Sequence, residues 1–308
     1  METKDQPKQR NLDDFLETLP KHLKPGDFLE TMKWARDFNP TDLKYGNIFM
    51  GYVDILGYQN LIKEFGDDAP RAIFEDILHA FSWAKSSKSS LKFTLFSDTL
   101  IIEADDDHPV GFWNIINVVR RFRNQLLEKG YLVRGSIVYG KHFNRKGIWV
   151  SPCLIKAHKL ESEIANVARI LIDEEAFNNG MKAVIERAAD HGIVYDRYFV
   201  KVDPTIIATD FDGSRVLRFD PDHIEVKYLK YAKHPDQKNL NEDRIMHCIN
   251  AGNQVLKRFH CGLKSALERA EDMKSRSKVM YFINKWNEYC EGFELKNELK
   301  EEYKIDIV

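Results

Sequence analysis

The chain has 308 residues, and its 43% hydrophobic and 12% aromatic content is enough to fill the core of one large domain or two small ones. The formal net charge of −2 provides no overall field to attract nucleic acid or a membrane surface. The polar N-terminus lacks an apolar signal core, no run approaches the roughly 20 apolar residues of a membrane span, and the four cysteines are scattered. These features predict a cytoplasmic protein without a membrane segment or a disulfide framework.

The first part of the chain divides at about residue 42. Residues 1–42 are polar with isolated aromatics, which predicts a leader with short helices. A nearly continuous apolar run over Ile48–Ile55 then predicts a strand that is buried on both faces. Apolar residues at helical spacing predict helices over Tyr58–Phe65 and Pro70–Trp83.

The middle of the chain predicts a hairpin, a helix and another strand. Two apolar runs, Leu91–Phe96 and Thr99–Glu103, flank a short polar break and predict the hairpin. An apolar stripe predicts an amphipathic helix over Phe112–Leu127. Leu132–Tyr139 predicts a strand that Gly140 closes.

The remaining pattern completes an α+β fold with an antiparallel hairpin in its middle. The further elements expected are a helix over Pro152–Ala165, strands over Ala168–Asp173, Val194–Val202 and Arg215–Phe219, a turn over Asp210–Gly213, and helix from about Leu240 to Phe293. We therefore divide the chain into a leader (1–42), a core domain (43–225) and a helical C-terminal extension (226–308).

Two aspartates lie where apolar strands should end. Asp54 ends the run Phe49-Met-Gly-Tyr-Val-Asp, and Asp98 lies in the polar break of the hairpin. A carboxylate flanked by buried residues is costly to desolvate unless a cation compensates it, and two together would repel. A divalent cation removes both problems, so a paired-aspartate metal site is indicated. The alternative for each residue alone is a turn former or a helix cap.

Gly57 adds a phosphate-binding feature beside Asp54. It follows the predicted strand closely and precedes the helix that begins at Tyr58. A strand, a tight glycine turn and a helix start together offer free backbone N–H groups to a phosphate.

Four segments taken together resemble a class III nucleotidyl cyclase domain over about residues 46–173. They are Tyr52-Val-Asp-Ile-Leu-Gly-Tyr58, Phe96-Ser-Asp-Thr99, Arg134-Gly-Ser-Ile-Val-Tyr-Gly140 and Ser151-Pro-Cys-Leu-Ile-Lys-Ala-His-Lys-Leu-Glu161. The resemblance implies the ferredoxin-like sheet of that family with helices packed on it, followed here by a helical C-terminal region.

The resemblance also implies roles for individual residues. Asp54 and Asp98 would hold two Mg²⁺ or Mn²⁺ ions per site, with help from the backbone carbonyl of Ile55. The family's transition-state arginine is replaced by Lys159, which can act only as a point charge. The backbone amides of Leu56, Gly57 and Tyr58 would bind phosphate oxygens, and the nucleoside triphosphate would also contact Tyr52, Arg134 and Lys156. Because sites of this family lie between two subunits, a homodimer is implied, with Lys159 or Lys156 reaching across to the triphosphate.

Three departures from the family pattern bear on the substrate. Ile155 stands at the position of the ribose-orienting asparagine, and Thr94 and Ile148 stand at the purine-reading positions. This combination is most similar to the bacterial pyrimidine cyclases of the Pycsar anti-phage systems. It implies cyclisation of a pyrimidine nucleoside triphosphate, with UTP favoured over CTP, to a 3′,5′-cyclic nucleotide signal with release of pyrophosphate.

Two other functions remain open on the sequence alone. The changes at Ile155 and Lys159 also suit a degenerate cyclase that binds a nucleotide or regulates a partner without turnover. A metal-dependent phosphotransferase or polymerase-palm relative would share the sheet and the paired aspartates. Arg120, Arg121 and Arg123 are expected to solvate the polar face of one helix, so no nucleic-acid partner is predicted.

Overall fold

The computed structural model describes residues 44–85, 91–105, 110–145, 148–191, 206–219, 242–292 and 305. The chain divides into two compact units, Met1–Lys44 and Tyr45–Val308. The helices and strands below belong to the second unit. The expected leader and the expected strand over Val194–Val202 lie outside the described residues.

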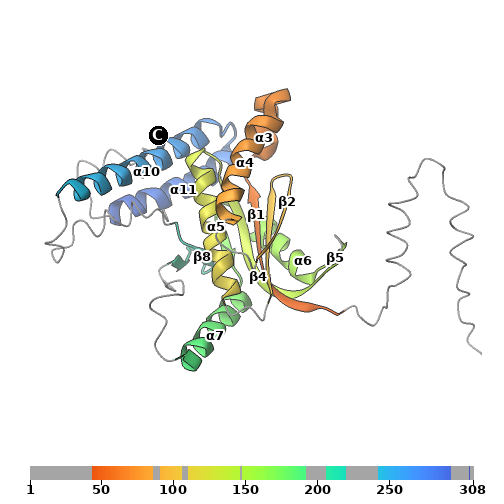
Figure 1. The fold of residues 1–308 in the computed structure, drawn as a ribbon. Helices are drawn as coiled ribbons and strands as arrows, with labels where there is room; N and C mark the ends of the chain where they lie inside the picture. The colour runs from red at the N-terminus through yellow and green to blue at the C-terminus, as the bar shows by residue number, and fades with distance from the viewer. Residues whose placement is uncertain are drawn as a thin grey trace, which may run out of the picture. The chain divides into compact units, whose positions relative to one another are not determined.

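The centre of the sheet has the ferredoxin-like order that the α+β prediction requires, so the predicted fold class is confirmed (Figure 1). Its strands are β1 (Gly46–Ile55), β2 (Lys92–Phe96), β3 (Thr99–Asp105) and β4 (Val133–Arg145). They lie in the order β2-β3-β1-β4, and each neighbouring pair is antiparallel. The sheet continues through β6 (Ile170–Ile172), β8 (Arg215–Leu217) and β7 (Ile207–Thr209). Only β4 and β6 run parallel among these pairs.

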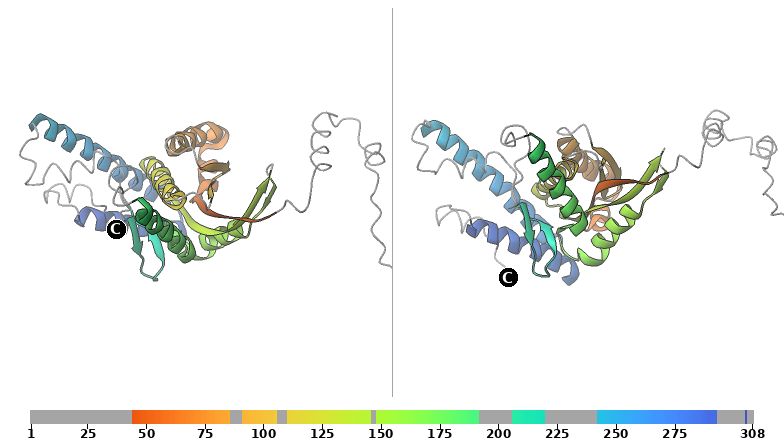
Figure 2. Two further views of the ribbon diagram at one scale, coloured as in Figure 1. Left: turned by 60° about the horizontal axis from the view of Figure 1, so that its bottom comes forward. Right: turned by 90° about the horizontal axis from the view of Figure 1, so that it is seen from below.

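Alternation along β1 sends neighbouring side chains to opposite faces of the sheet. Phe49 and Val53 pack into the main core with the helix α5 (Gly111–Glu128). Met50 packs on the other face with Cys153 of the helix α6 (Pro152–Lys159). Figure 2 shows α5 and α6 on opposite sides of the sheet. Since Asp54 lies four residues after Met50, it shares the α6 face.

The N-terminus of α6 is fixed by a buried polar network. Ser151 caps the helix by accepting a hydrogen bond from the Leu154 N–H at 2.9 Å, and its Oγ lies 2.7 Å from His142 Nδ1. His142 Nε2 lies 3.3 Å from Glu103 Oε2. Because Glu103 is on β3 and His142 on β4, the network ties the helix to two central strands.

The C-terminal helices pack beside the sheet and form a second core. The helices are α10 (Glu242–Glu268) and α11 (Met273–Gly292), and α10 contacts α5 (Figure 1). We call the cluster that they bury the C-terminal core; it includes Leu127, Leu132, Phe219, Val255, Leu256, Phe259, Leu263, Val279, Phe282, Ile283 and Trp286. None of the described helices is both long and apolar enough to cross a membrane.

The remaining helices complete the fold. They are α3 (Tyr58–Phe65), α4 (Ala69–Lys85) and α7 (Glu174–His191). The bounds of α3 match the prediction, and α4 extends it by one to two residues at each end. The predicted turn over Asp210–Gly213 is also present, between β7 and β8.

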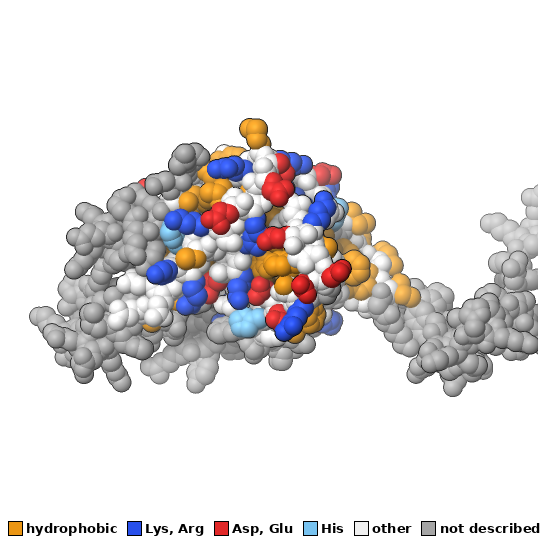
Figure 3. All heavy atoms as spheres, turned by 90° about the horizontal axis from the view of Figure 1, so that it is seen from above, with side chains coloured by type: hydrophobic (Ala, Val, Ile, Leu, Met, Phe, Trp, Pro, Cys, Tyr) orange, Lys and Arg blue, Asp and Glu red, His pale blue; other side chains and the backbone are white. Residues whose placement is uncertain are grey.

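Four expectations need correction. The strand β4 continues past Gly140 and pairs with an unpredicted strand, β5 (Ile148–Val150). The helix α7 was not predicted, and the C-terminal helical run breaks between α10 and α11. Arg120 and Arg123 are buried and do not solvate a polar helix face; Arg123 donates hydrogen bonds to the carbonyls of Leu217 and Arg218. On the face shown in Figure 3, acidic and basic side chains are interspersed.

Candidate active site

Strand pairing brings the two aspartates together at one end of the sheet. Asp54 pairs with Thr99, the residue that follows Asp98, in the β1–β3 ladder. The Ile55 N–H donates to the Asp98 carbonyl at 3.1 Å, and Thr99 Oγ1 donates to Asp54 Oδ1 at 3.5 Å. Ser97, with a φ of 56°, gives the hairpin its tight turn. The β1 end and the hairpin tip are therefore one structural unit.

A cation and a third carboxylate complete this group. Arg134 is opposite Asp54 on β4, and its Nε lies 3.4 Å from Asp54 Oδ2. The same nitrogen forms an ion pair with Glu161, whose side chain is buried. Glu161 belongs to the π-helical segment Leu160–Ile164 that continues α6. Such π turns often occur at functional sites, and this one presents Glu161 to Arg134.

The site carries more buried negative charge than its one adjacent arginine can balance. Burial raises the pKa of Asp54 to about 6, with further contributions from Asp98 and Glu161, while Arg134 opposes the shift. Burial also raises the pKa of Glu161 and that of the Tyr52 phenol. An added cation would stabilise the ionised carboxylates.

The donor set suits a hard divalent cation. Carboxylate oxygens together with a backbone carbonyl are the ligands that Mg²⁺ and Mn²⁺ prefer. The described residues contain no cluster of three or more His, Cys, Asp or Glu side chains able to hold a metal. Asp54 and Asp98 would therefore share any metal ion with water, a backbone oxygen or substrate phosphate.

The turn after β1 supports part of the expected phosphate site. Gly57 is left-handed, with a φ of 75°, and it precedes α3 without any side-chain cap on the first-turn N–H groups. The Leu56 N–H, however, donates to the Leu132 carbonyl at 2.8 Å. The expectation that Leu56 offers its amide to phosphate is thus corrected, because that amide is already used. Phosphate binding by the amides of Gly57 and Tyr58 stays a prediction.

The two lysines of α6 are in different situations. Lys156 Nζ donates to Asp173 Oδ2 at 2.6 Å and to Glu175 Oε2 at 3.0 Å. The structure therefore does not bring Lys156 to Asp54 and Asp98. The Lys159 side chain is 67% exposed, and its nearest carboxylate in the described chain is Glu163 at 3.9 Å. Lys159 can therefore move toward a ligand, while Lys156 would first have to leave two ion pairs.

The positions expected near the base are spread over several elements. Tyr52 shares the Asp54 face of β1, and its ring meets His158 edge-on with the centroids 6.0 Å apart. Thr94 is half-buried on β2, whereas Ile148 on β5 and Ile155 on α6 are 50% and 72% exposed. These four positions therefore lie on four different elements, β1, β2, β5 and α6.

The sequence reasoning missed three residues of this region. The sequence could have indicated Thr99, because it follows Asp98 directly in the predicted hairpin. It could also have indicated Glu161, the acidic residue at the end of the segment Ser151–Glu161. Lys278 of α11 had none, yet it is close enough that its charge lowers the pKa of Glu161.

No protein-family model and no curated protein matches the sequence. Several solved structures are similar to part of the chain. The adenylyl cyclase CyaB from P. aeruginosa is 17% identical with a TM-score of 0.35, covering 45% of this chain and 82% of its own. A class III adenylyl cyclase-like ATP-binding protein from Pseudomonas aeruginosa is 13% identical with a TM-score of 0.33, covering 47% and 38%. The guanylyl cyclase Cya2 is 9% identical with a TM-score of 0.28, covering 44% and 79%. All three span less than half of this chain at TM-scores below 0.5, so function has to be argued from the site's own residues.

Proposed function

We propose that this protein is a metal-dependent nucleotidyl cyclase that converts a pyrimidine nucleoside triphosphate, UTP rather than CTP, into a 3′,5′-cyclic nucleotide. The 3′ oxygen attacks the α-phosphorus, the bond to the β-phosphate breaks, and pyrophosphate leaves. The observation that carries the proposal is that the β1–β3 pairing places Asp54 and Asp98 at the same end of the sheet, beside the turn at Gly57, which no side chain caps. We further propose a role in anti-phage signalling, on the resemblance to pyrimidine cyclases alone.

The residues of the site divide the work by their chemistry. Asp54 and Asp98 would hold two Mg²⁺ or Mn²⁺ ions, which when bound supply Lewis-acid activation of the 3′-hydroxyl and charge neutralisation at the phosphates. The amides of Gly57 and Tyr58 would orient phosphate oxygens. Arg134, held between Asp54 and Glu161, would add a fixed positive charge beside them.

Product analysis with each of the four nucleoside triphosphates tests the proposal. The protein is incubated with each triphosphate and Mn²⁺, and the products are resolved by mass spectrometry. We expect cyclic UMP from the wild type and none from Asp98→Ala. The matched control is Asp105→Ala, which removes an exposed carboxylate at the other end of β3. A cyclic product from ATP or GTP alone would refute the pyrimidine assignment.

The proposed enzyme is a homodimer with sites between its subunits. If Asp54 and Lys159 serve one site from opposite chains, each single variant has two broken sites. Mixing Asp54→Ala with Lys159→Ala then gives heterodimers in which one site keeps both residues. We expect activity to return on mixing. Mixtures that stay inactive after confirmed subunit exchange would place both residues in one chain's site.

A nucleotide-binding protein without turnover is the second candidate. It is favoured by the exposed apolar side chain of Ile155 and by the engagement of Lys156 with Asp173 and Glu175. Binding of a triphosphate with Mn²⁺ that leaves all four nucleotides unconsumed would support this candidate over the cyclase.

A further inference from the structure

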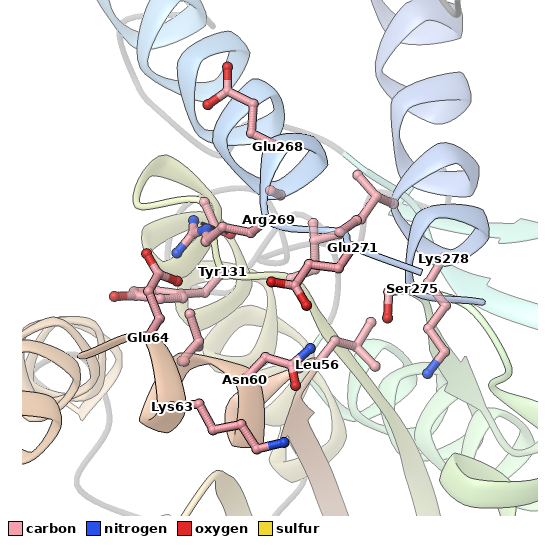
Figure 4. A pocket seen from close by; sticks show the side chains of 17 residues that line it. Leu56, Asn60, Lys63, Glu64, Tyr131, Glu268, Arg269, Glu271, Ser275 and Lys278 are labelled. Carbon is pink, nitrogen blue, oxygen red and sulfur yellow. Dashed lines mark hydrogen bonds between the residues drawn. The ribbon is translucent and has the colours of Figure 1, made fainter. Parts of the chain in front are cut away.

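A pocket of about 580 Å³ lies between the turn after β1 and the turn that joins α10 to α11 (Figure 4). Its size falls within the range of small-molecule sites. Figure 4 shows Lys278 and Ser275 on the same side of the pocket as Leu56, with Glu64 and Glu268 toward the other side. Gly57 and Lys63 also line it, so the expected phosphate turn and the C-terminal helices share one cavity.

Lys278 is held in place by the part of α11 that follows it. Tyr281 and Lys285 lie three and seven residues further on, and therefore on the same face of the helix. The Tyr281 hydroxyl donates to Asp210 Oδ2 at 2.7 Å, and Lys285 Nζ lies 3.8 Å from Asp210 Oδ1. Asp210 is itself paired at 2.8 Å with the buried Arg169.

The apolar side of α11 fixes the helix further. Val279, Phe282, Ile283 and Trp286 are all buried in the C-terminal core. The helix also has a firm start, because Asp272 accepts hydrogen bonds from the N–H and the hydroxyl of Ser275 at 2.6 and 3.0 Å. The ammonium of Lys278 is thus carried on a rigid element, which is what a binding residue needs.

The charges around Lys278 leave room for an anion. In the described chain, no carboxylate forms an ion pair with this half-buried lysine. Burial lowers its pKa, Arg134 and Lys274 add to that effect, and Asp272 and Asp54 oppose it. Lys278 and Lys63 line the same cavity as the left-handed turn at Gly57, whose first-turn N–H groups no side chain caps. A polyphosphate anion in this cavity would accept hydrogen bonds from the turn and pair with the Lys278 ammonium.

We infer that Lys278 binds the β- and γ-phosphates of the nucleotide, or the pyrophosphate that they become, so that the α10–α11 hairpin forms one wall of the active site. This inference rests on the proposed function for the identity of the nucleotide. It assigns the C-terminal extension a part in binding the substrate.

Titration of the full-length protein with inorganic pyrophosphate and Mg²⁺ tests this inference without requiring turnover. We expect Lys278→Gln to weaken binding by about tenfold or more, the scale of one lost charge-assisted contact. Lys278→Arg keeps the charge and should stay within about threefold of wild type. The matched control is Lys264→Gln, an exposed lysine of α10 outside the pocket, and it should bind as wild type does.

The outcomes separate this inference from the proposed function. Equal affinities for Lys278→Gln and Lys264→Gln, or no pyrophosphate binding by the wild type, would overturn it. Equal losses in the Gln and Arg variants would show altered packing rather than lost charge, and would overturn it too. If no nucleotide is cyclised but Lys278→Gln alone loses pyrophosphate, the cyclase proposal fails and the phosphate site stands.

Discussion

Replacing Asp54 by asparagine should stabilise the metal-free protein. The structure raises the pKa of this carboxyl from 3.8 to about 6, mainly by burial and then by the charges of Asp98 and Glu161. A difference of about two pKa units corresponds to about 3 kcal/mol of unfavourable free energy at neutral pH. Because the side chain is 17% exposed and the variant forgoes the attraction of Arg134, we expect a net gain of about 1–2 kcal/mol.

The gain should depend on pH with a definite sign. The pKa of Asp54 is higher in the folded chain than in the unfolded one, so the folded state binds the proton more tightly. The carboxyl therefore costs no stability below pH 3.8, and its cost grows as the pH rises through about 6. Asp54→Asn should match the wild type at the acidic end of this range and exceed it at pH 8.

Thermal unfolding in EDTA and in excess Mn²⁺ measures both effects. At pH 8 in EDTA the variant should melt about 2–6 °C above the wild type. Added Mn²⁺ should raise the melting temperature of the wild type but not that of the variant. Asp105→Asn, at an exposed carboxylate, is the control and should respond to Mn²⁺ as the wild type does. A variant that is less stable at pH 8 in EDTA, or that gains equally from Mn²⁺, would refute the reasoning.

Substitutions at three further positions test other features of the molecule. Asp98→Ala should abolish cyclic-nucleotide formation while far-UV circular dichroism and the melting temperature stay close to wild type; retained turnover with unchanged metal dependence would contradict the metal role. Lys159→Arg should keep activity and Lys159→Ala should lose it, since only the charge is needed; full activity of the Ala variant would remove this lysine from the mechanism. Gly262→Ala should cost about 2–4 kcal/mol in urea unfolding, because its Cβ would lie 1.9 Å from the Leu127 carbonyl oxygen; a loss below about 0.5 kcal/mol would show that α10 shifts freely on α5.

The central strands and helices could be predicted because the apolar pattern of each sequence segment matches the faces that the segment buries in the folded protein. The nearly continuous apolar run of β1 reflects burial on both faces of the sheet, and the period-3.6 stripe of α5 reflects burial on one side of the helix. Gly140 misled the prediction because a glycine in a strand resembles a stop signal. In the structure Gly140 is an interior residue of a longer strand, and a Cβ there would be in ordinary van der Waals contact with Cys153 of α6.

The misjudged arginines have a different cause. The sequence pattern predicts that Arg120 and Arg123 lie on the solvent-exposed, polar side of an amphipathic helix. A single sequence cannot show that α10 and the β8 region cover that side. Arg123 is buried because it satisfies two carbonyls more than 90 residues away. Interactions at such separation leave no local period, which is also why Lys278 could not be connected with Asp54.

The placement of Asp54 near Asp98 could be predicted from the sequence, because a hairpin tip and a strand end meet through backbone pairing alone. The contacts that hold the turn after Asp54 in place could not be predicted. The Ile55 N–H donates to the Asp98 carbonyl, and the Leu56 N–H donates to the Leu132 carbonyl. The side chain of Leu132 is buried in the C-terminal core. Leu56 itself packs against the same core. The turn that carries the candidate metal and phosphate groups is therefore held by helices encoded more than 180 residues later. Changes in how α10 and α11 pack should reach the site through Leu56 and Leu132 as well as through Lys278.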